Sequence, residues 1–197
     1  FIFYITTISQ GAVTYQYVFF YSVMYGLLLI IPILTMRMFA EERKTGTEQL
    51  LLTSPRSITA IVLGKFFAAV AVIFITLLIS FMYFAIVRCF GKANIVTVLV
   101  TMFGFLITSM AYISLGMFIS SLTENQIIAA VSTIAIFVLA WLAPSISTKL
   151  TAISLIEKFY PFATGVFPIT ETISLISITA MFVALTMVVI KRRKLVK

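Results

Sequence analysis

Long apolar runs separated by short polar segments dominate the pattern along this chain. A transmembrane helix needs about 20 mainly apolar residues, and the complete runs approach or exceed that length. Pro32 near the end of the first run predicts a kink, and Pro144 marks the end of the fourth. The pattern therefore predicts an all-α membrane protein, a polytopic helical bundle in one domain over residues 1–197. Its five complete transmembrane helices are expected at residues 17–36, 61–87, 95–122, 127–143 and 172–190.

The first residues, 1–8, belong to a further apolar run that is too short to cross a bilayer. They lack the basic start and small-residue cleavage site of a signal peptide. We interpret this run as the tail of a sixth, truncated helix whose beginning is missing. An interfacial N-terminal segment is the alternative interpretation.

Composition supports lipid as the solvent and excludes several kinds of chemistry. The chain is 62% hydrophobic and 10% charged, whereas soluble domains are about 45–50% apolar and about 25% charged. It contains no histidine, no aspartate and a single cysteine, Cys89. Most hydrolytic triads, histidine metal sites and internal disulfides are thereby excluded. We expect no catalytic, cofactor-binding or metal-binding residue in this chain.

Basic residues are distributed unequally between the two sets of connecting segments. Residues 37–60, the turn at 123–126 and the tail at 191–197 would lie on one side and hold most of the lysines and arginines. The opposite set contains only Arg88, Lys92, Lys149 and Lys158. Cytoplasmic loops are enriched in Lys and Arg, so we expect the first set, including the C-terminus, to be cytoplasmic.

The segment 37–60 is the longest polar stretch, and it contains three of the six acidic residues. Thr45 and Glu48 have capping-box spacing, which predicts a helix beginning near Gly46. Gly46 would either break the preceding helix or permit close approach of another backbone. Three leucines at 50–52 would give the new helix an apolar side, so it would lie parallel to the membrane. A plain interfacial hairpin with solvated charges is the alternative.

Two other connections have patterns of their own. In the turn 123–126, Thr123 and Gln126 have capping-box spacing for the next helix, which Glu124 would complement electrostatically. The outer loop, 144–171, is divided by prolines and contains apolar residues at roughly helical spacing. Its aromatic residues would suit the membrane interface, so an amphipathic segment on the outer leaflet is one interpretation.

The polar motifs also carry a resemblance to a known family. Glu41-Glu42-Arg43, Gly46-Thr47, the leucines at 50–52, Ser54-Pro55 and Gly64-Lys65 resemble the signature of type-2 ABC-transporter permeases. The stretch from Ser120 to Gln126 resembles the inner turn between that family's fourth and fifth helices. The resemblance covers nearly the whole chain and is most similar to the gliding-motility-associated permease subgroup. Because the family has six helices, it implies that the first is truncated here.

The resemblance implies the membrane subunit of a bacterial exporter in the inner membrane. In the family, two permease subunits, identical or related, pair with two ATPase subunits that bind ATP and Mg²⁺. This chain has no phosphate-binding loop and no aspartate for a Walker-B role, so it would not be an enzyme. No nucleic-acid partner is implied.

The resemblance also assigns roles to particular residues. A coupling helix contacts the ATPase in this family, and the corresponding residues here are Glu41, Glu42, Arg43, Gly46, Thr47, Leu50 and Leu51. A second cytoplasmic contact would involve Thr123, Glu124, Asn125 and Gln126, for which a simple capped turn is the alternative. Paired re-entrant helices in the outer loop would form an outer gate, with Phe159, Tyr160, Pro161 and Phe162 as its candidate residues.

Other function classes fit the sequence less well. A stand-alone secondary transporter or channel predicts polar or charged groups at mid-membrane and an internal repeat, and neither is clear here. A membrane-embedded enzyme predicts clustered aspartate, histidine or cysteine, which the composition largely excludes. A membrane scaffold would leave the patterned polar segment at 37–60 unexplained.

Overall fold

The computed structural model describes residues 23–49, 56–90, 95–146 and 154–196, and every regular element in these ranges is a helix. Four described helices are long and apolar enough to cross a membrane, at Ile58–Met82, Ile95–Leu122, Gln126–Ile146 and Ile169–Arg193. The prediction of an all-helical membrane protein is therefore confirmed. The predicted helix tail at 1–8 and the leucines at 50–52 lie outside the described residues.

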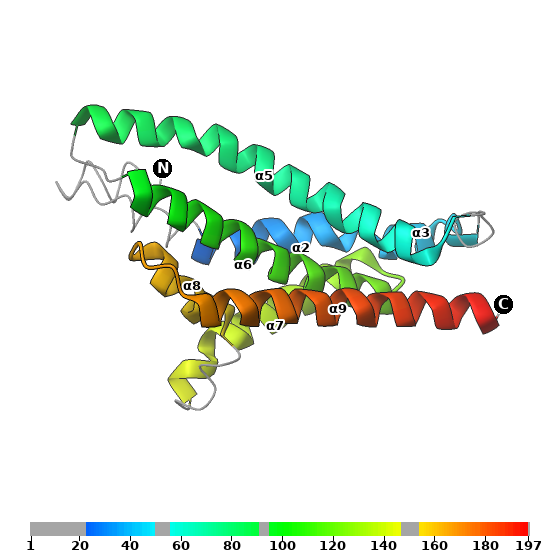
Figure 1. Cartoon of the computed structure of the whole chain (residues 1–197). Coiled ribbons are helices and arrows are strands. Elements are labelled where there is room, and N and C mark those ends of the chain that lie inside the picture. Colours follow the sequence, from blue (N-terminus) through cyan, green and yellow to red (C-terminus); the bar gives the residue numbers. More distant parts are fainter. Residues whose placement is uncertain (1–22, 50–55, 91–94, 147–153, 197) are drawn as a thin grey trace.

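The described elements are one π-helical turn and seven α-helices. In chain order they are the π-helical turn η2 (Val23–Leu27), α2 (Leu28–Met36), α3 (Ala40–Lys44), α5 (Ile58–Phe90), α6 (Ile95–Leu122), α7 (Gln126–Ile146), α8 (Leu155–Ala163) and α9 (Ile169–Val196). Figure 1 shows α3 and the C-terminal part of α9 at one end of the bundle, and α8 at the opposite end.

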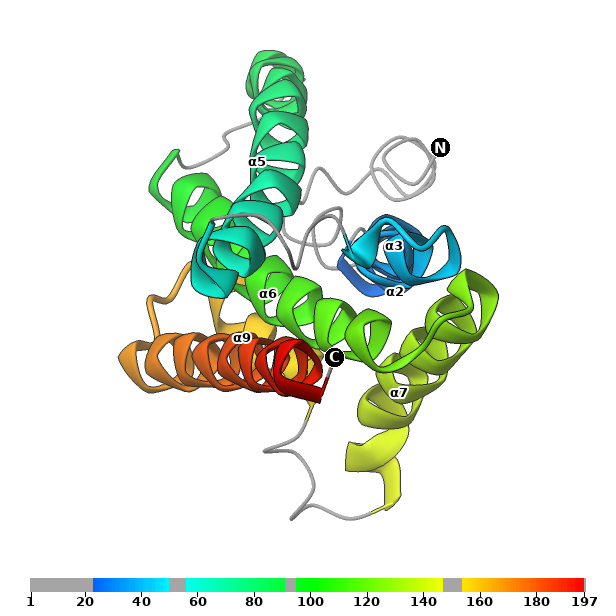
Figure 2. The same cartoon turned by 90° about the vertical axis from the view of Figure 1, so that its right-hand side faces the viewer.

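Helix α6 is the centre of the bundle. It packs against α2, α5, α7, α8 and α9, and Figure 2 shows it surrounded by its neighbours. The most apolar stretch of α6 is 44% buried, whereas the corresponding stretches of the other three candidate spans are 22% to 28% buried. The outer helices instead expose large apolar side chains such as Ile79, Leu139 and Val188. This pattern is typical of a bundle whose periphery faces lipid.

Small residues allow neighbouring helices to approach α6 closely. A Cβ atom added at Gly116 would overlap the hydroxyl of Thr35 on α2, and one added at Gly104 would overlap the ring of Phe162 on α8. In lipid, helices gain little from apolar burial against one another, so van der Waals contact at small residues becomes the main source of association. Gly104 and Gly116 thus fix the positions of α8 and α2.

Several helix ends differ from the predicted ones. Helix α7 continues to Ile146 and contains Pro144 in its last turn, whereas the predicted span ended at residue 143. Proline at this position disturbs hydrogen bonding only in the last turn, so Ser145 and Ile146, which follow it, remain helical. Helix α9 begins at Ile169 and extends to Val196, which makes the basic tail a continuation of the helix. Helix α5 is likewise longer than the predicted 61–87.

The contact between Gly116 and Thr35 gives a direct test of this packing. We expect Gly116→Ala to destabilise the fold by about 1–3 kcal/mol, because the added methyl overpacks a close helix crossing. Gly64→Ala is the matched control, since a Cβ at this α5 position meets no atom within 4 Å. Thermal unfolding in detergent would measure both variants. Equal loss of stability in the two would contradict the assigned contact.

Candidate functional site

The polar segment predicted from the sequence lies at one end of the bundle, together with two segments that are distant in sequence. We define the polar end as residues 37–49, 120–126 and 191–193. Helix α3 contacts both α6 and α7 here, and the C-terminal part of α9 lies at the same end (Figure 1). The site is therefore built by three separate parts of the chain.

One buried hydroxyl attaches the corner between α2 and α3 to α6. The backbone N–H groups of Phe39 and Ala40 both donate to Ser120 Oγ at 3.2 Å, and Ser120 Oγ donates to the carbonyl of Met36 at 3.1 Å. Helix starts leave N–H groups without partners inside the helix, and Ser120 satisfies one at α3. Residues at both sides of the corner are thereby fixed to the central helix.

Helix α3 ends at Lys44, two residues before a glycine with a left-handed backbone. Gly46 has φ of +74°, a conformation that residues with a Cβ adopt only at a cost. A Cβ there would meet no atom within 4 Å, so the requirement is conformational and close approach is not the reason. A helix does begin at Glu48, near the predicted start, but the Thr45 hydroxyl is turned to the preceding helix. This hydroxyl donates to the carbonyl of Glu41 at 2.9 Å, which places Thr45 at the end of α3.

Glu42 is paired within the protein. One of its carboxylate oxygens lies 2.5 Å from Lys65 Nζ, and both side chains are less than a quarter exposed. Lys65 also donates to the carbonyl of Met38, and its ammonium lies 4.7 Å from the centre of the Phe39 ring. The other oxygen, Glu42 Oε2, is buried without a hydrogen-bond partner among the described residues. Glu42 therefore joins α3 to α5.

Arg43, Glu48, Glu124 and Arg193 form a second group, which we call the charge network. Arg43 pairs with Glu124 and donates to the carbonyl of Leu122 at 3.3 Å, and its Nε lies 3.8 Å from Glu48. Arg193 pairs with the same Glu48 at 3.2 Å and also donates to the carbonyl of Ser121. The network connects the segment after Gly46 to α9, and α3 to the turn between α6 and α7.

The contribution of the charge network to stability depends on how deeply its side chains are buried. The Glu48 side chain is 15% exposed and Arg43 is 17% exposed, whereas Glu124 is 70% exposed. Fully exposed ion pairs contribute little to stability, but loss of one partner from a largely buried pair leaves a charge without compensation. Glu48 is the critical carboxylate, because it is enclosed between two arginines.

The turn between α6 and α7 is capped differently from the prediction. Asn125 Oδ1 accepts a hydrogen bond from the Ile127 N–H at 2.9 Å, so Asn125 caps α7 and the predicted role of Thr123 is wrong. Asparagine is among the best N-cap residues. Glu124 points to Arg43, which means that this turn contacts α3 directly. Gln126 is the first residue of α7.

The predicted coupling residues that the structure describes divide into those paired inside the protein and those exposed at its surface. Glu42 and Arg43 make ion pairs inside the protein, while Gly46 and Thr47 are exposed and Glu41 is partly exposed. Leu50 and Leu51 lie outside the described residues. Sequence reasoning missed the parts played by Ser120, Lys65 and Arg193. Lys65 and Ser120 lie in the motifs that resemble the permease family, but no contact was predicted for them. Arg193 was used only to predict which side of the membrane the C-terminus occupies.

The candidate outer-gate residues lie on α8 at the opposite end. Phe159 and Phe162 are fully buried, Pro161 is partly buried, and Tyr160 is 56% exposed. Ser154 caps this helix by accepting from the Glu157 N–H at 3.4 Å. Side chains of two neighbouring helices then hold α8. Thr101 of α6 donates to the Phe162 carbonyl at 3.0 Å, and Lys158 donates to Glu171 at 3.2 Å and to Ser174 at 2.8 Å on α9. Helix α8 is thus packed against α6 and α9.

The hydroxyl of Ser120 can be removed to test the anchor at the polar end. We expect Ser120→Ala to cost about 1–3 kcal/mol locally, because buried N–H groups lose their acceptor. Hydrogen exchange at the amides of Phe39 and Ala40 should accelerate. Ser80→Ala is the control, since Ser80 donates to a carbonyl of its own helix, that of Thr76. Unchanged exchange at residues 39 and 40 would contradict the anchor.

Comparisons with known proteins identify a family and no individual relative. Neither the curated proteins nor the solved structures include a match to this chain. The family model described as "ABC-2 family transporter protein" matches residues 3–190, which include every described helix except the last residues of α9, and the polar end except its segment 191–193. Since the match extends over nearly all of the chain, this protein belongs to the ABC-2 transporter family.

Proposed function

We propose that this chain is the permease subunit of a bacterial ABC exporter and that its polar end receives the ATPase subunit. Family membership supports the permease role. The observation that carries the proposal is the connection of α3 and the segment after it to three other parts of the protein, through Ser120, Lys65 and the charge network. A segment held in this way can transmit force from a partner.

The arrangement provides a separate route to each neighbouring element. Displacement of α3 would pass to α6 through Ser120, to the start of α7 through Arg43 and Glu124, and to α9 through Glu48 and Arg193. Packed helices move as bodies between discrete arrangements, because close-packed contacts deform little. Nucleotide-driven movement of an ATPase would therefore change the positions of membrane helices together.

We further propose that the outward and inward residues of the coupling segment have different roles. The outward residues Glu41, Lys44, Thr45, Gly46 and Thr47 would contact the ATPase, since they are exposed or partly exposed. The inward residues Glu42, Arg43 and Glu48 would transmit the movement, since their carboxylates and guanidinium are paired inside the protein. This refines the assignment from the sequence, which treated Glu42 and Arg43 as direct contacts.

The remaining roles follow from the same proposal. The polar end would be cytoplasmic in the bacterial inner membrane, and a second permease subunit, identical or related, would complete the transporter. ATP and Mg²⁺ would bind the ATPase, so this chain would hydrolyse nothing itself. Helix α8 would contribute to an outer gate, with buried Phe159 and Phe162 as its closing side chains. The gliding-motility-associated subgroup remains the proposed subgroup.

Site-directed crosslinking tests the position of the ATPase. In a Cys89→Ser background, a photoreactive probe on Thr47→Cys should crosslink to the ATPase that copurifies with the full-length permease. Thr164→Cys is the matched control, because Thr164 is also exposed but lies after α8 at the opposite end. Crosslinking from position 164, or from neither position in a complex that still copurifies, would refute docking at the polar end.

Arg193→Gln tests transmission separately from docking. The substitution removes the link from α9 to Glu48 and leaves that carboxylate less compensated. We expect the ATPase to copurify normally, while substrate transport per ATP hydrolysed in proteoliposomes falls severalfold. Arg192→Gln is the matched control, since Arg192 is the exposed neighbour on the same helix. Similar behaviour of both variants would show that the charge network does not transmit movement.

A further inference from the structure

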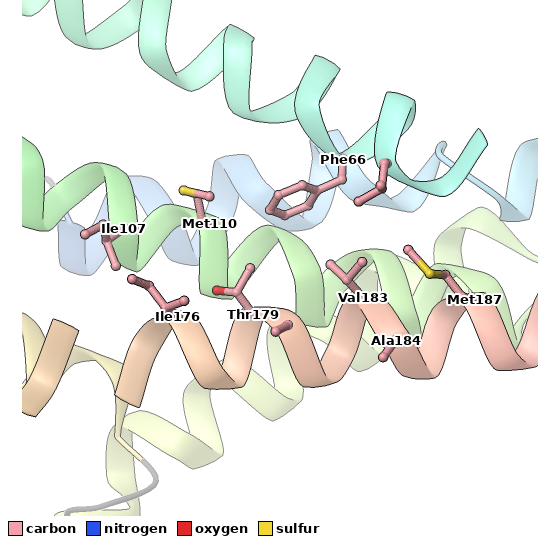
Figure 3. Close-up of a pocket in the computed structure, with 10 residues that line it drawn as sticks. Phe66, Ile107, Met110, Ile176, Thr179, Val183, Ala184 and Met187 are labelled. Atoms are coloured by element: carbon pink, nitrogen blue, oxygen red, sulfur yellow. The ribbon is translucent and has the colours of Figure 1, made fainter. Parts of the chain in front are cut away.

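An apolar groove lies between α5, α6 and α9, and none of its lining residues belongs to α8 or to the charge network. It has a volume of about 320 Å³, and Leu63, Phe66, Met110, Val183 and Met187 are among its lining residues. Figure 3 shows Phe66 directed from α5 toward α6 and α9. Thr179 is its polar lining residue, and the Thr179 hydroxyl already donates to the Leu175 carbonyl at 2.8 Å. The groove therefore suits a hydrocarbon chain.

The position and length of the groove indicate which hydrocarbon can reach it. All three helices that form it are candidate membrane spans, so the groove lies at bilayer depth. On α9 its lining extends from Ile176 to Met187, which corresponds to about 16 Å along the helix axis. That is roughly half of the ~30 Å hydrocarbon core, or the depth of one leaflet. One acyl chain of a bilayer lipid would match this length.

Positive charge is placed at one end of the groove. Val183 and Met187 lie one turn apart on α9, and one turn beyond Met187 the same side of the helix carries buried Ile190 and exposed Lys191. Lys191 and its neighbour Arg192 are exposed. Four of the six acidic side chains, those of Glu42, Glu48, Glu124 and Glu171, pair with other cations, namely Arg43, Lys65, Lys158 and Arg193. A lysine at this level can extend its ammonium to the headgroup region.

We propose that this groove binds an anionic phospholipid, with one acyl chain between α5, α6 and α9 and its phosphate on Lys191. The ligand follows from two features: an apolar groove as long as one leaflet is deep, and an exposed lysine one turn beyond Met187 at one end of it. The inference requires insertion into a membrane and does not depend on the proposed docking of an ATPase.

Fluorescence quenching by brominated lipids tests the proposal on the full-length protein. Trp141 is the single tryptophan, so Trp141→Phe combined with Leu63→Trp places the only indole in the groove. In phosphatidylcholine nanodiscs, brominated phosphatidylglycerol should quench this indole at about one-fifth of the fraction needed for brominated phosphatidylcholine. That ratio corresponds to one lysine near an anionic headgroup. Equal quenching by the two lipids would overturn the proposal.

Two pairs of variants separate the headgroup contact from the groove. Lys191→Gln should abolish the preference for phosphatidylglycerol, whereas Lys44→Gln, the same charge change on α3, should preserve it. Ala184→Phe fills the groove from an exposed position and should reduce quenching by both lipids. Leu185→Phe, on the same helix outside the lining, should leave quenching unchanged. An unaltered preference in Lys191→Gln would refute the headgroup contact.

A second copy of the chain is the competing occupant. In the Cys89→Ser background, Ala184→Cys should form no disulfide between copies if lipid fills the groove. Efficient crosslinking at this position, together with weak quenching of the groove indole, would overturn the proposal in favour of a protein interface. Met187→Trp in the Trp141→Phe background repeats the quenching with Leu63 intact, so a disturbance caused by the first reporter would be recognised.

Discussion

Close approach of neighbours to α6 is the constraint on which the other features depend. Lipid removes most of the gain from burying apolar side chains between helices, so contact must come from small residues and from hydrogen bonds. Gly116 admits α2, and Ser120, one turn further along α6, binds the corner that follows α2. Gly104 admits Phe162 of α8, and Thr101, one turn earlier, donates to the Phe162 carbonyl. Each end of α6 therefore pairs a glycine with a hydroxyl, and each pair positions one candidate functional element.

The charges are confined to the ends of this framework. Four of the six acidic residues form ion pairs, and these lie either at the polar end or between α8 and α9. A charge at mid-membrane is costly and usually marks an ion or proton pathway. The described spans have their ionic contacts near their ends, which is the arrangement expected of helices that cross lipid. The ion pairs of this protein join helices to one another and to the connecting segments.

The sequence was sufficient for features that depend on composition over many residues. Apolar runs of about 20 residues predict membrane helices without any knowledge of partners, and the polar segment at 37–60 stands out by its charge alone. The direction in which each charge faces was not predictable. Glu42 pairs with a residue 23 positions away, Arg43 with one 81 positions away, and Glu48 with one 145 positions away. Helix α3 has only five residues, which is too few for periodicity to identify an inner face.

Two predicted helix caps, at Thr45 and at Thr123, are not formed for a related reason. The capping-box pattern occurs at Thr45, at Thr123 and at Ser154, but only Ser154 accepts from the backbone three residues later in the described structure. At Thr45, the glycine that follows ends α3, so the hydroxyl donates backward to that helix. At Thr123, Asn125 lies next to the helix start and supplies the acceptor. Local spacing identifies candidates for a cap, and the position of the helix start decides among them.

Helix α9 contributes to both the charge network and the apolar groove. Arg193 faces α6 and the charge network, and Lys191, two residues earlier, lies on a different side of the same helix turn, in line with the groove. A lipid that binds one position of α9 more tightly than another shifts the equilibrium between those positions by its difference in affinity. Coupling between two sites is reciprocal, so the state of the charge network would change lipid affinity by the same factor. The end of α9 is therefore where membrane composition and force from an ATPase would act on one element.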